Sequence, residues 1–505
     1  MIAKTLSALP YGFESSLIEV EGDKNQGLPA FNIVGMAKKT ISEARERVKS
    51  ALRASGFSFP TEKITLNLAP ADLEKEGTSL DLPIAINLLI LSGQLRQEDV
   101  ENAAFAGELS LDGGLKPIRG AVNIAEAAKK AGLKFLFIPV ANLDQARLIS
   151  GIKIVGIDSL PQLFLHLKGE KTIQNPKSVV KNTETDVETL KFTDIKGQPL
   201  AKRALEIALA GHHNILLSGP PGTGKTALSK AALSLLPDLT RQELISVTKL
   251  YSLTEATGHI SKKRPFRAPH HTSSLISLIG GGASAKPGEI SLAHLGVLFL
   301  DELPEFKRDH LEALRQPLED KTISISRANH KYTYPADFTL IATMNPCPCG
   351  YLGDLAHPCS CTEFQIKNYQ RRISGPLLDR IDLFVEVSRV KTSELITAVN
   401  PVNSPDQSLD VVKNTIKGAI SSQHSRYHND TLYNASLSSA MIVKHIPLAP
   451  QVKRFLDQAA TALDLSARSY FKIIKVARTI ADLDRAQEVS EDHIKEALSF
   501  RRKTP

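Results

Sequence analysis

This 505-residue chain has no tryptophan and only four cysteines, and none of its apolar runs is long enough for a membrane helix. A spanning helix needs roughly 18 or more consecutive apolar residues, so the sequence excludes a helical membrane protein. The opening segment, Met1–Leu6, lacks the apolar centre of a signal peptide. The composition, with 42% hydrophobic and 23% charged residues, is typical of a soluble protein, and we expect a cytoplasmic location.

Acidic residues are outnumbered by basic ones. The chain has 62 lysines and arginines against 54 aspartates and glutamates, which gives a formal net charge of +8 and an isoelectric point near 9.1. This balance suits a polyanionic partner such as nucleic acid. It does not require one, because a basic protein can equally carry solvated lysine faces. The length predicts two to four domains, each large enough for its own core.

The most informative feature is a glycine-rich loop directly after the apolar strand Ile215–Leu217. It matches the pattern G-x-x-x-x-G-K-[ST], in which backbone N–H groups surround nucleotide phosphates. Lys225 would reach the β and γ phosphate oxygens, Thr226 would hold Mg²⁺, and a helix over Thr226–Leu236 would add its positive end. The sequence therefore predicts that the chain binds and hydrolyses ATP. The loop residues are Gly219, Pro220, Pro221, Gly222, Thr223, Gly224, Lys225 and Thr226.

Two later apolar strands end in polar residues that complete an ATPase site. Gly296–Leu300 is followed by Asp301, which would orient the Mg²⁺ ion, and by Glu302, which would polarise the attacking water as general base. Phe338–Met344 is followed by Asn345, placed to hydrogen-bond the water or the γ-phosphate. In isolation either strand could end in an exposed polar turn, but the phosphate loop upstream favours the catalytic interpretation.

Arginines further along the chain offer positive charge for the transferred phosphoryl group. Arg380 immediately precedes a predicted strand, and residues 373–382 resemble the corresponding region of AAA+ ATPases. That resemblance implies a finger inserted into a neighbouring subunit's site, and hence a ring; the alternative is a surface arginine in a salt bridge. Arg468 resembles the second sensor arginine of the same class, with Arg478 as the alternative.

Four longer strings indicate the family more closely: residues 264–271 (RPFRAPHH), 345–350 (NPCPCG), 374–380 (SGPLLDR) and 476–483 (VARTIADL). They resemble the bacterial ComM/YifB family of magnesium-chelatase-like AAA+ proteins, and the similarity extends along essentially the whole chain. The resemblance implies a homo-oligomeric, hexameric ATPase that moves along single-stranded or branched DNA and promotes branch migration when competent bacteria integrate incoming DNA. The alternatives are a magnesium-chelatase-like motor subunit and an ATP-dependent protein remodeller.

Two insertions fit a polymer threaded through a ring. Residues 322–326 and 332–334 alternate as strands around a basic tip, and they resemble the hairpin placed before the first sensor strand in this AAA+ clade. Six copies of Arg327 and Lys331 would there grip DNA phosphates. The Gly-rich, apolar residues 275–282 predict a mobile pore loop. Alternatively, both insertions brace contacts between subunits.

All the cysteines lie close together, as Cys347, Cys349, Cys359 and Cys361. In a protein expected in the cytoplasm, such a group favours a structural Zn²⁺ site over disulfides, since four thiolates complete a tetrahedron. The C-x-C spacing is tighter than the more usual C-x2-C, and free buried thiols or a redox switch are the alternatives. His357 could substitute as a ligand, although a solvent-facing histidine is the simpler interpretation.

The N-terminal region resembles the proteolytic domain of Lon over residues 76–83 and 107–120. In that resemblance Ser79 occupies the position of the nucleophile, which needs an adjacent lysine as its base. Val122 stands where this lysine belongs, and the pair Lys129–Lys130 lies two helical turns further along. We therefore expect no protease activity, and a scaffold or DNA-binding role for the domain.

Together these patterns predict an α/β protein in three parts. The first is an N-terminal Lon-protease-like (ribosomal S5 domain 2-like) α+β domain, the second a P-loop AAA+ α/β domain, and the third a C-terminal helical lid. A polar stretch with little apolar periodicity marks the linker. The expected boundaries are 1–167 for the Lon-like domain, 168–191 for the linker, 192–390 for the AAA+ core with a cysteine-rich insertion at 347–361, and 391–505 for the lid.

Overall fold

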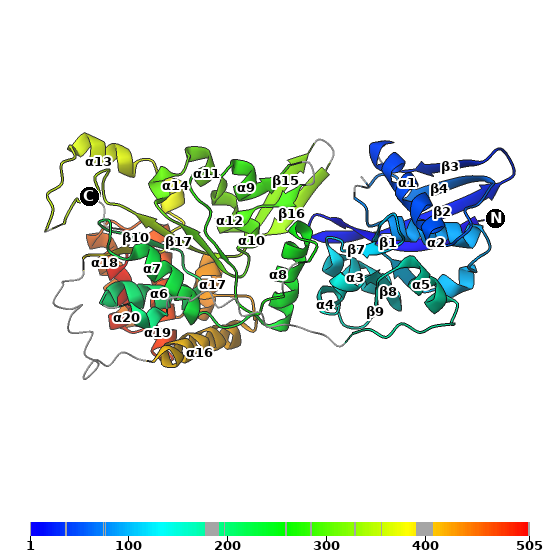
Figure 1. Cartoon of the computed structure of the whole chain (residues 1–505). Helices are drawn as coiled ribbons and strands as arrows, with labels where there is room; N and C mark the ends of the chain where they lie inside the picture. The colour runs from blue at the N-terminus through cyan, green and yellow to red at the C-terminus, as the bar shows by residue number, and fades with distance from the viewer. Residues whose placement is uncertain are drawn as a thin grey trace.

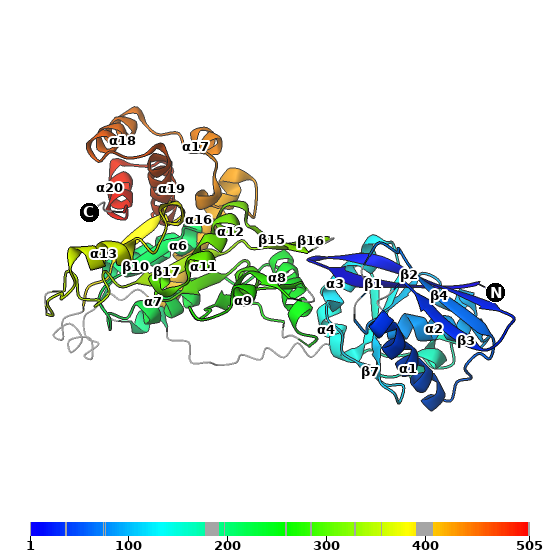
Figure 2. The ribbon, with the colours of Figure 1, turned by 90° about the horizontal axis from the view of Figure 1, so that it is seen from above.

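The computed structural model describes residues 2–35, 38–73, 75, 77–176, 191–195, 197–257, 260–282, 285–327, 330–354, 356–389 and 408–502. The N-terminal domain, coloured blue to cyan in Figure 1, lies at one end of the molecule, and the ATPase core with the C-terminal helices lies at the other. Figure 2 shows that a hairpin and helix α8 (Arg241–Thr254) of the core face the N-terminal domain.

The N-terminal domain is built on a seven-stranded mixed sheet in the order β3-β4-β2-β1-β5-β8-β9. Strands β1 and β2 form a long antiparallel hairpin, whereas β5, β8 and β9 are parallel and are joined by crossovers. The strands are β1 (Ile2–Tyr11), β2 (Glu14–Asn25), β3 (Ala30–Val34), β4 (Lys63–Ala69), β5 (Ala103–Phe105), β8 (Phe135–Pro139) and β9 (Lys153–Ile157), with a small hairpin of β6 (Glu108–Leu109) and β7 (Leu115–Lys116). The helices are α1 (Lys38–Ala54), α2 (Asp81–Leu91), α3 (Ala121–Lys130), α4 (Leu143–Ala146) and α5 (Leu160–Leu167).

Helix α2 is buried along its whole length. Its sequence is apolar on every face apart from Asp81 and Asn87, which is the pattern of a helix enclosed by other layers. Both polar side chains have partners. Arg47 donates to Asp81 at 2.8 Å, and Asn87 donates to two backbone carbonyls of neighbouring strands at 3.1 and 2.9 Å. The loop before this helix, which contains Ser79, is therefore attached to a firmly held element.

The described part of the predicted linker is tied to the N-terminal domain. Residues 168–176 contain no helix or strand, but Asn175 binds strand β9. Its side chain accepts from the Gly156 amide at 2.8 Å and donates to the Ile154 carbonyl at 2.7 Å. The rest of the linker, and the start expected for the lid, fall at residues 177–190 and 390–407, which lie outside the described residues.

The ATPase core holds a five-stranded parallel sheet in the order β11-β14-β17-β10-β18. Its strands are β10 (Ile215–Ser218), β11 (Phe266–Arg267), β14 (Val297–Leu300), β17 (Thr339–Met344) and β18 (Leu383–Glu386). Every residue of β14 and β17 is buried, as expected for central strands of a parallel sheet covered on both faces. Numbered along the chain, the strands run 5-1-4-3-2 across the sheet, which is an AAA-like arrangement.

The helices of the core are α6 (Pro199–Gly211), α7 (Lys225–Ala231), α8, α9 (Leu275–Ile279), α10 (Glu289–Leu292), α11 (Arg308–Ala313), α12 (Arg315–Asp320), α13 (Glu363–Gln370) and α14 (Gly375–Leu378). A two-stranded ribbon, β15 (Thr322–Arg327) and β16 (His330–Pro335), projects from the core toward the N-terminal domain (Figure 2). Among the helices of the described residues, none combines the length and apolarity that crossing a membrane requires.

The Gly-rich segment 275–282, where the sequence suggested a mobile loop, contains regular structure. Residues Leu275–Ile279 form α9, and the Ser274 side chain caps its first turn. Gly280–Gly281 then form strand β12, which pairs with β13 (Lys286–Pro287). The segment is thus a capped helical turn that leads into a short hairpin, next to the core sheet.

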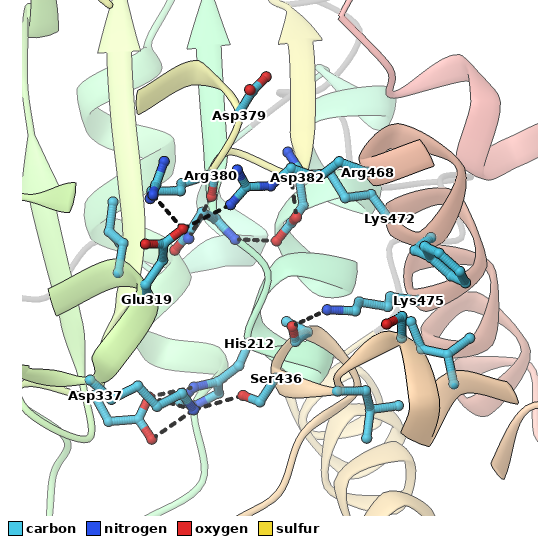
Figure 3. A pocket seen from close by; sticks show the side chains of 18 of the residues that line it. His212, Glu319, Asp337, Asp379, Arg380, Asp382, Ser436, Arg468, Lys472 and Lys475 are labelled. Atoms are coloured by element: carbon cyan, nitrogen blue, oxygen red, sulfur yellow. Dashed lines mark hydrogen bonds and ion pairs between the residues drawn. The ribbon is translucent and has the colours of Figure 1, made fainter. Parts of the chain in front are cut away.

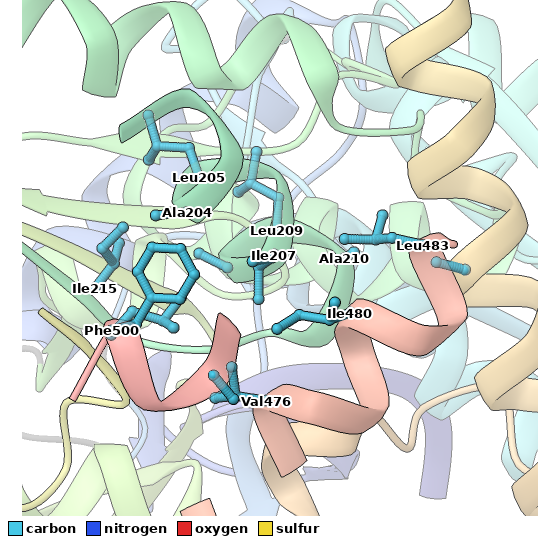
Figure 4. Packing of buried hydrophobic residues seen from close by; sticks show 14 of the residues in the cluster. Ala204, Leu205, Ile207, Leu209, Ala210, Ile215, Val476, Ile480, Leu483 and Phe500 are labelled. Atoms are coloured by element: carbon cyan, nitrogen blue, oxygen red, sulfur yellow. The ribbon is translucent and has the colours of Figure 1, made fainter. Parts of the chain in front are cut away.

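The C-terminal helices pack on the core as a lid, and they are α16 (Leu409–Tyr427), α17 (Ser439–His445), α18 (Pro450–Ala462), α19 (Ala467–Leu483) and α20 (Glu491–Ser499). Val476, Ile480 and Leu483 share one face of α19 through their i, i+4, i+7 spacing. Figure 4 shows this face turned toward Ile207 and Ala210 of α6. Burial of each large apolar side chain stabilises the contact by about 1.5–3 kcal/mol relative to exposure, so the lid is firmly seated on the nucleotide-binding core.

Helices α3 and α8 join the N-terminal domain to the core. Asn123 of α3 accepts from the Ser252 hydroxyl at 3.1 Å, and Glu126 pairs with Lys249 of α8 at 2.8 Å. The Lys249 side chain is only 4% exposed and also lies 4.0 Å from the ring centroid of Phe13. The two bodies are therefore connected through buried polar contacts, in addition to the chain itself.

Candidate active site

The phosphate loop lies at the carboxyl end of β10 and leads into α7. Gly222 and Gly224 have φ angles of +76° and +82°, which residues with a Cβ rarely adopt, and these angles turn the loop back on itself. Lys225 is the first residue of α7, and its ammonium donates to the carbonyl oxygens of Gly219 and Pro220 at 2.6 and 2.8 Å. The loop therefore encloses the lysine as the sequence predicts.

The acidic pair follows β14 at the same edge of the sheet. The Thr226 hydroxyl donates to Asp301 Oδ2 at 2.9 Å, so the two residues predicted to hold Mg²⁺ are in direct contact. A hydroxyl and a carboxylate are oxygen donors of the kind that Mg²⁺ prefers, and they fit this ion. Glu302 is exposed and has a φ of +53°, a left-handed conformation that is uncommon for a side chain of this size.

Sequence reasoning missed the role of Thr343, a buried residue near the carboxyl end of β17. Its hydroxyl donates to Asp301 Oδ1 at 2.5 Å and accepts from the backbone amide of Glu302 at 3.0 Å. One hydroxyl therefore positions both acids. The available signal was a polar residue within a buried strand, two positions before Asn345.

Asn345 follows β17 and reaches the phosphate loop. Its side-chain oxygen lies 3.3 Å from Lys225 Nζ, which donates to it. Lys225 is only 9% exposed; burial lowers its pKa, and the attraction of the Asp301 and Glu302 carboxylates opposes that shift. Three neighbouring strand ends thus bring together the four residues predicted to bind and cleave the nucleotide.

The predicted arginine finger lies at the opposite edge of the sheet. Arg380 precedes the amino end of β18, whereas the phosphate loop follows the carboxyl end of β10, the adjacent parallel strand. A strand of four residues spans about 13 Å, so Arg380 does not join Lys225 of its own chain. Its side chain is 9% exposed and forms an ion pair with Glu319 of α12.

Arg468 joins Arg380 rather than the phosphate loop. It lies in the first turn of α19, is 48% exposed, and donates to Glu319 Oε1 at 3.1 Å. Figure 3 shows both guanidinium groups directed at this one carboxylate. The alternative sensor, Arg478, is buried and donates to Asp482 and to two backbone carbonyls at 2.9, 2.6 and 2.8 Å. Arg478 therefore holds the lid together and does not face a ligand.

The sulfur atoms of the four cysteines lie within 4.8 Å of one another. The Sγ–Sγ distances are 3.4 Å for Cys347–Cys349, 3.7 Å for Cys347–Cys359 and 3.6 Å for Cys349–Cys359. Sulfurs around a tetrahedral zinc, with Zn–S bonds of about 2.3 Å, are about 3.8 Å apart. The amide of Cys349 also points at the sulfur of Cys361 at 3.4 Å, a contact that stabilises a thiolate. The cluster is consistent with a zinc site.

The cysteine-rich insertion borders the phosphate loop. Gly350 has a φ of +86° and lies so close to Pro221 that an added Cβ would be 2.8 Å from Pro221 Cδ. His357 stacks on Tyr351 with ring centroids 5.1 Å apart and is not part of the sulfur cluster. A metal held by the cysteines would therefore stabilise one wall of the nucleotide site.

Comparisons with known proteins agree with this geometry. The family described as "Magnesium chelatase, subunit ChlI" matches residues 191–395, "Subunit ChlI of Mg-chelatase" matches 20–142, and "Magnesium chelatase, subunit ChlI C-terminal" matches 406–501. "Competence protein ComM" of Haemophilus influenzae is 42% identical over 505 residues, with 99% of this chain and 97% of that protein covered. This chain belongs to the ComM/YifB family.

Other relatives support the same assignment. "Uncharacterized protein YifB" of Escherichia coli is 42% identical over 506 residues, covering 99% of this chain and 96% of that protein. A more distant relative, "Magnesium-chelatase 67 kDa subunit" of Chlorobaculum tepidum, is 22% identical over 318 residues, covering 61% of this chain and 42% of that protein. The family predicted from the motifs is confirmed. ComM/YifB proteins are AAA+ ATPases of the magnesium-chelatase type, so ATP and Mg²⁺ are the implied substrate and cofactor.

In this ComM/YifB chain the hairpin β15–β16 carries the residues predicted to contact DNA. Its strand register leaves a two-residue turn at 328–329, which the structure does not describe. Lys331 is exposed next to the turn; Arg327 ends β15, and its side chain is outside the described part. Further from the tip, the ring of Tyr332 lies 4.8 Å from the ring of Tyr11 in the N-terminal domain. The hairpin is therefore basic near its tip and braced lower down.

The N-terminal domain of this family member does not offer Ser79 a lysine from α3. Val122 is fully buried in an apolar cluster, and Lys129 and Lys130 are exposed at the C-terminal end of the helix. Ser79 lines a cavity between the domain and the core hairpin, together with Tyr332. The surroundings of Ser79 therefore agree with the expectation drawn from Val122.

Proposed function

We propose that this chain is an ATP-driven DNA translocase that works as a hexameric ring and promotes branch migration during recombination of incoming DNA in natural transformation. One observation carries the proposal. Lys225 and the acids occupy the carboxyl edge of the core sheet, while Arg380 and Arg468 occupy its amino edge. Each subunit thus offers two complementary halves of a nucleotide site, which only a second copy can complete.

In the proposed site, the phosphate loop and Lys225 bind the triphosphate. Mg²⁺, when bound at Thr226 and Asp301, neutralises charge on the phosphate oxygens. Glu302 accepts the proton of the attacking water, and Asn345 orients that water toward the γ-phosphorus. Thr343 keeps both acids at the strand end, because its hydroxyl bonds to Asp301 and to the Glu302 amide.

The arginines would act on the neighbouring subunit's nucleotide. Positive charge brought to the γ-phosphate stabilises the transition state, and an arginine of this kind raises the rate by about 10³-fold or more. A head-to-tail contact that repeats between identical subunits closes into a ring when the rotation allows it. Hydrolysis at one interface then moves one subunit against the next.

DNA is the proposed polymer in the channel. The formal net charge of +8 and the basic residues Arg327 and Lys331 on the hairpin suit a phosphate backbone. The relative named "Competence protein ComM" supports a role in the uptake or integration of DNA. The matches to magnesium chelatase subunits support the second candidate, a motor subunit that drives metal insertion.

The decisive experiment measures ATP hydrolysis and strand exchange on a synthetic branched DNA junction with the purified full chain. We expect DNA to stimulate hydrolysis and ATP to drive branch migration. Glu302→Gln should still bind ATP but should lose turnover and migration, because the general base is removed. Hydrolysis that is indifferent to single-stranded, forked and four-way DNA would favour the chelatase or protein-remodelling alternatives.

A paired substitution sharpens the assignment of the hairpin. Arg327→Ala with Lys331→Ala should weaken DNA binding and reduce the salt dependence of the affinity by about two charges. The matched control is Lys453→Ala with Arg454→Ala, which removes the same charges from the exposed face of α18. Equal DNA affinity in both double variants would exclude the hairpin from the interface.

A further inference from the structure

Glu319 lies between the two arginines and the hairpin. It belongs to the last turn of α12, is 48% exposed, and uses one oxygen, Oε1, to pair with both Arg380 and Arg468 (Figure 3). Arg380 comes from the loop before β18, and Arg468 comes from the lid. Three separate parts of the core thus meet at a single carboxylate.

The charges at this meeting point do not balance. Two guanidinium groups share one carboxylate, and the Nε atom of Arg380 is buried without a hydrogen-bond partner among the described residues. The Arg380 side chain is 9% exposed, so this donor is also poorly hydrated. An anion with several oxygens, such as a triphosphate, would satisfy more of these donors than one carboxylate can. Glu319 and a phosphate group therefore compete for the same arginines.

The hairpin begins immediately after this contact. Lys321 connects α12 to β15; its ammonium binds Asp337 at 3.0 Å and Ser436 of the lid at 2.6 Å. The amide of Ala336 donates to the Lys321 carbonyl at 2.7 Å, so both ends of the hairpin are fastened together. A shift of the α12 end would be transmitted along the paired strands toward Lys331, because the ribbon is hydrogen-bonded along its length.

We propose that Glu319 is a positioning residue that reports the nucleotide state of the neighbouring subunit to the DNA hairpin. This inference rests on the proposed function, in which Arg380 and Arg468 serve the neighbour's site. When a triphosphate takes both arginines, Glu319 is released, and the end of α12 moves with the hairpin. When the phosphate leaves, Glu319 binds the arginines again and the hairpin returns.

The first test is Glu319→Gln in the assembled full chain, which preserves the side-chain shape but removes its charge. We expect DNA to lose its stimulation of hydrolysis, and the KM for ATP to fall about 3- to 10-fold as the competing carboxylate is removed. Glu312→Gln is the matched control, because Glu312 pairs only with the exposed Arg315 on the adjoining helix at 2.8 Å. Glu319→Asp, which keeps the charge, should recover part of the DNA response.

A second measurement needs no DNA and so separates this inference from the proposed function. The chain has no tryptophan, so Thr333→Trp on the exposed face of the hairpin gives a single fluorescent reporter. A non-hydrolysable ATP analogue should change its emission, and adding Glu319→Gln should abolish that change while the ring still assembles. An equal change with and without Glu319→Gln would overturn the relay. A clear Glu319-dependent change in a protein that ignores DNA would instead overturn the DNA function and leave the nucleotide relay standing.

Discussion

The regions around Ser79 and Lys225 both resemble enzyme sites, but only the second holds a complete set of reactive residues. Around Lys225, three strand ends bring an ammonium, two carboxylates and an amide into contact distance. Around Ser79, the adjacent helix α3 presents the apolar Val122 to a closed core. The comparison teaches that a retained fold does not preserve chemistry once the partner of the reactive group is lost.

The electrostatic environments differ in the same direction. Lys225 is enclosed by carbonyl oxygens and faces two carboxylates, so its positive charge is held where phosphates would bind. On α3, the charged residues Glu126 and Lys130 point to each other and toward the core rather than toward Ser79. One site keeps charge in place for a ligand, while the other uses charge to join two domains.

The largest expected effect is that of Lys225→Ala. Removing a buried, hydrogen-bonded charge from a phosphate site should weaken ATP binding about 100-fold or more and abolish hydrolysis. Titration with a fluorescent ATP analogue would measure the affinity. The control is Lys230→Ala, which removes an exposed lysine from the same helix and should leave the affinity unchanged. Tight ATP binding by Lys225→Ala would remove the main difference between the two sites.

An intermediate effect is expected from Cys349→Ser. The protein should contain about one zinc ion per chain, and this variant should lose it, because three thiolates hold the metal more weakly than four. Hydrolysis should decrease but not vanish, since the insertion borders the phosphate loop through Gly350 and Pro221. Elemental analysis and steady-state hydrolysis would test both points. Ser360→Ala, within the same loop, serves as the control and should retain metal and activity; an untreated protein free of metal would contradict the zinc assignment.

The smallest expected effect is that of Ser79→Ala. Hydrolysis of ATP should match the parent chain, and stability should change by no more than about 0.5 kcal/mol, because the substitution removes only one hydroxyl. Neither protein should cleave peptide or casein substrates in the presence of ATP. Cleavage by the parent chain that Ser79→Ala abolishes would show that the N-terminal site is active and would break the comparison.

Much of the nucleotide site could be predicted because its signals are local. Each of Lys225, Asp301 and Asn345 follows an apolar strand, and parallel strands bring their carboxyl ends to one edge of a sheet. The same logic predicted the cysteine cluster, since all its members lie in one short segment. Residues with a role fixed by a neighbouring motif can thus be read from the chain.

The remaining features depend on contacts between distant segments. Glu319, Arg380 and Arg468 come from three elements, and nothing in the sequence near Glu319 indicates that they meet. The approach of Gly350 to Pro221 likewise requires the folded insertion. The attachment of Asn175 to strand β9 is a third example, because the polar segment around it has the composition of a free linker.

The buried contact of Lys249 with Glu126 and Phe13 has a mechanical consequence. A lysine enclosed between a carboxylate and an aromatic ring cannot slide without losing both partners at once, so helix α8 transmits rotation to the N-terminal domain with little slack. Six such subunits arranged in a circle would carry their former protease domains as a stiff collar, stacked on the motor and turning in step with it.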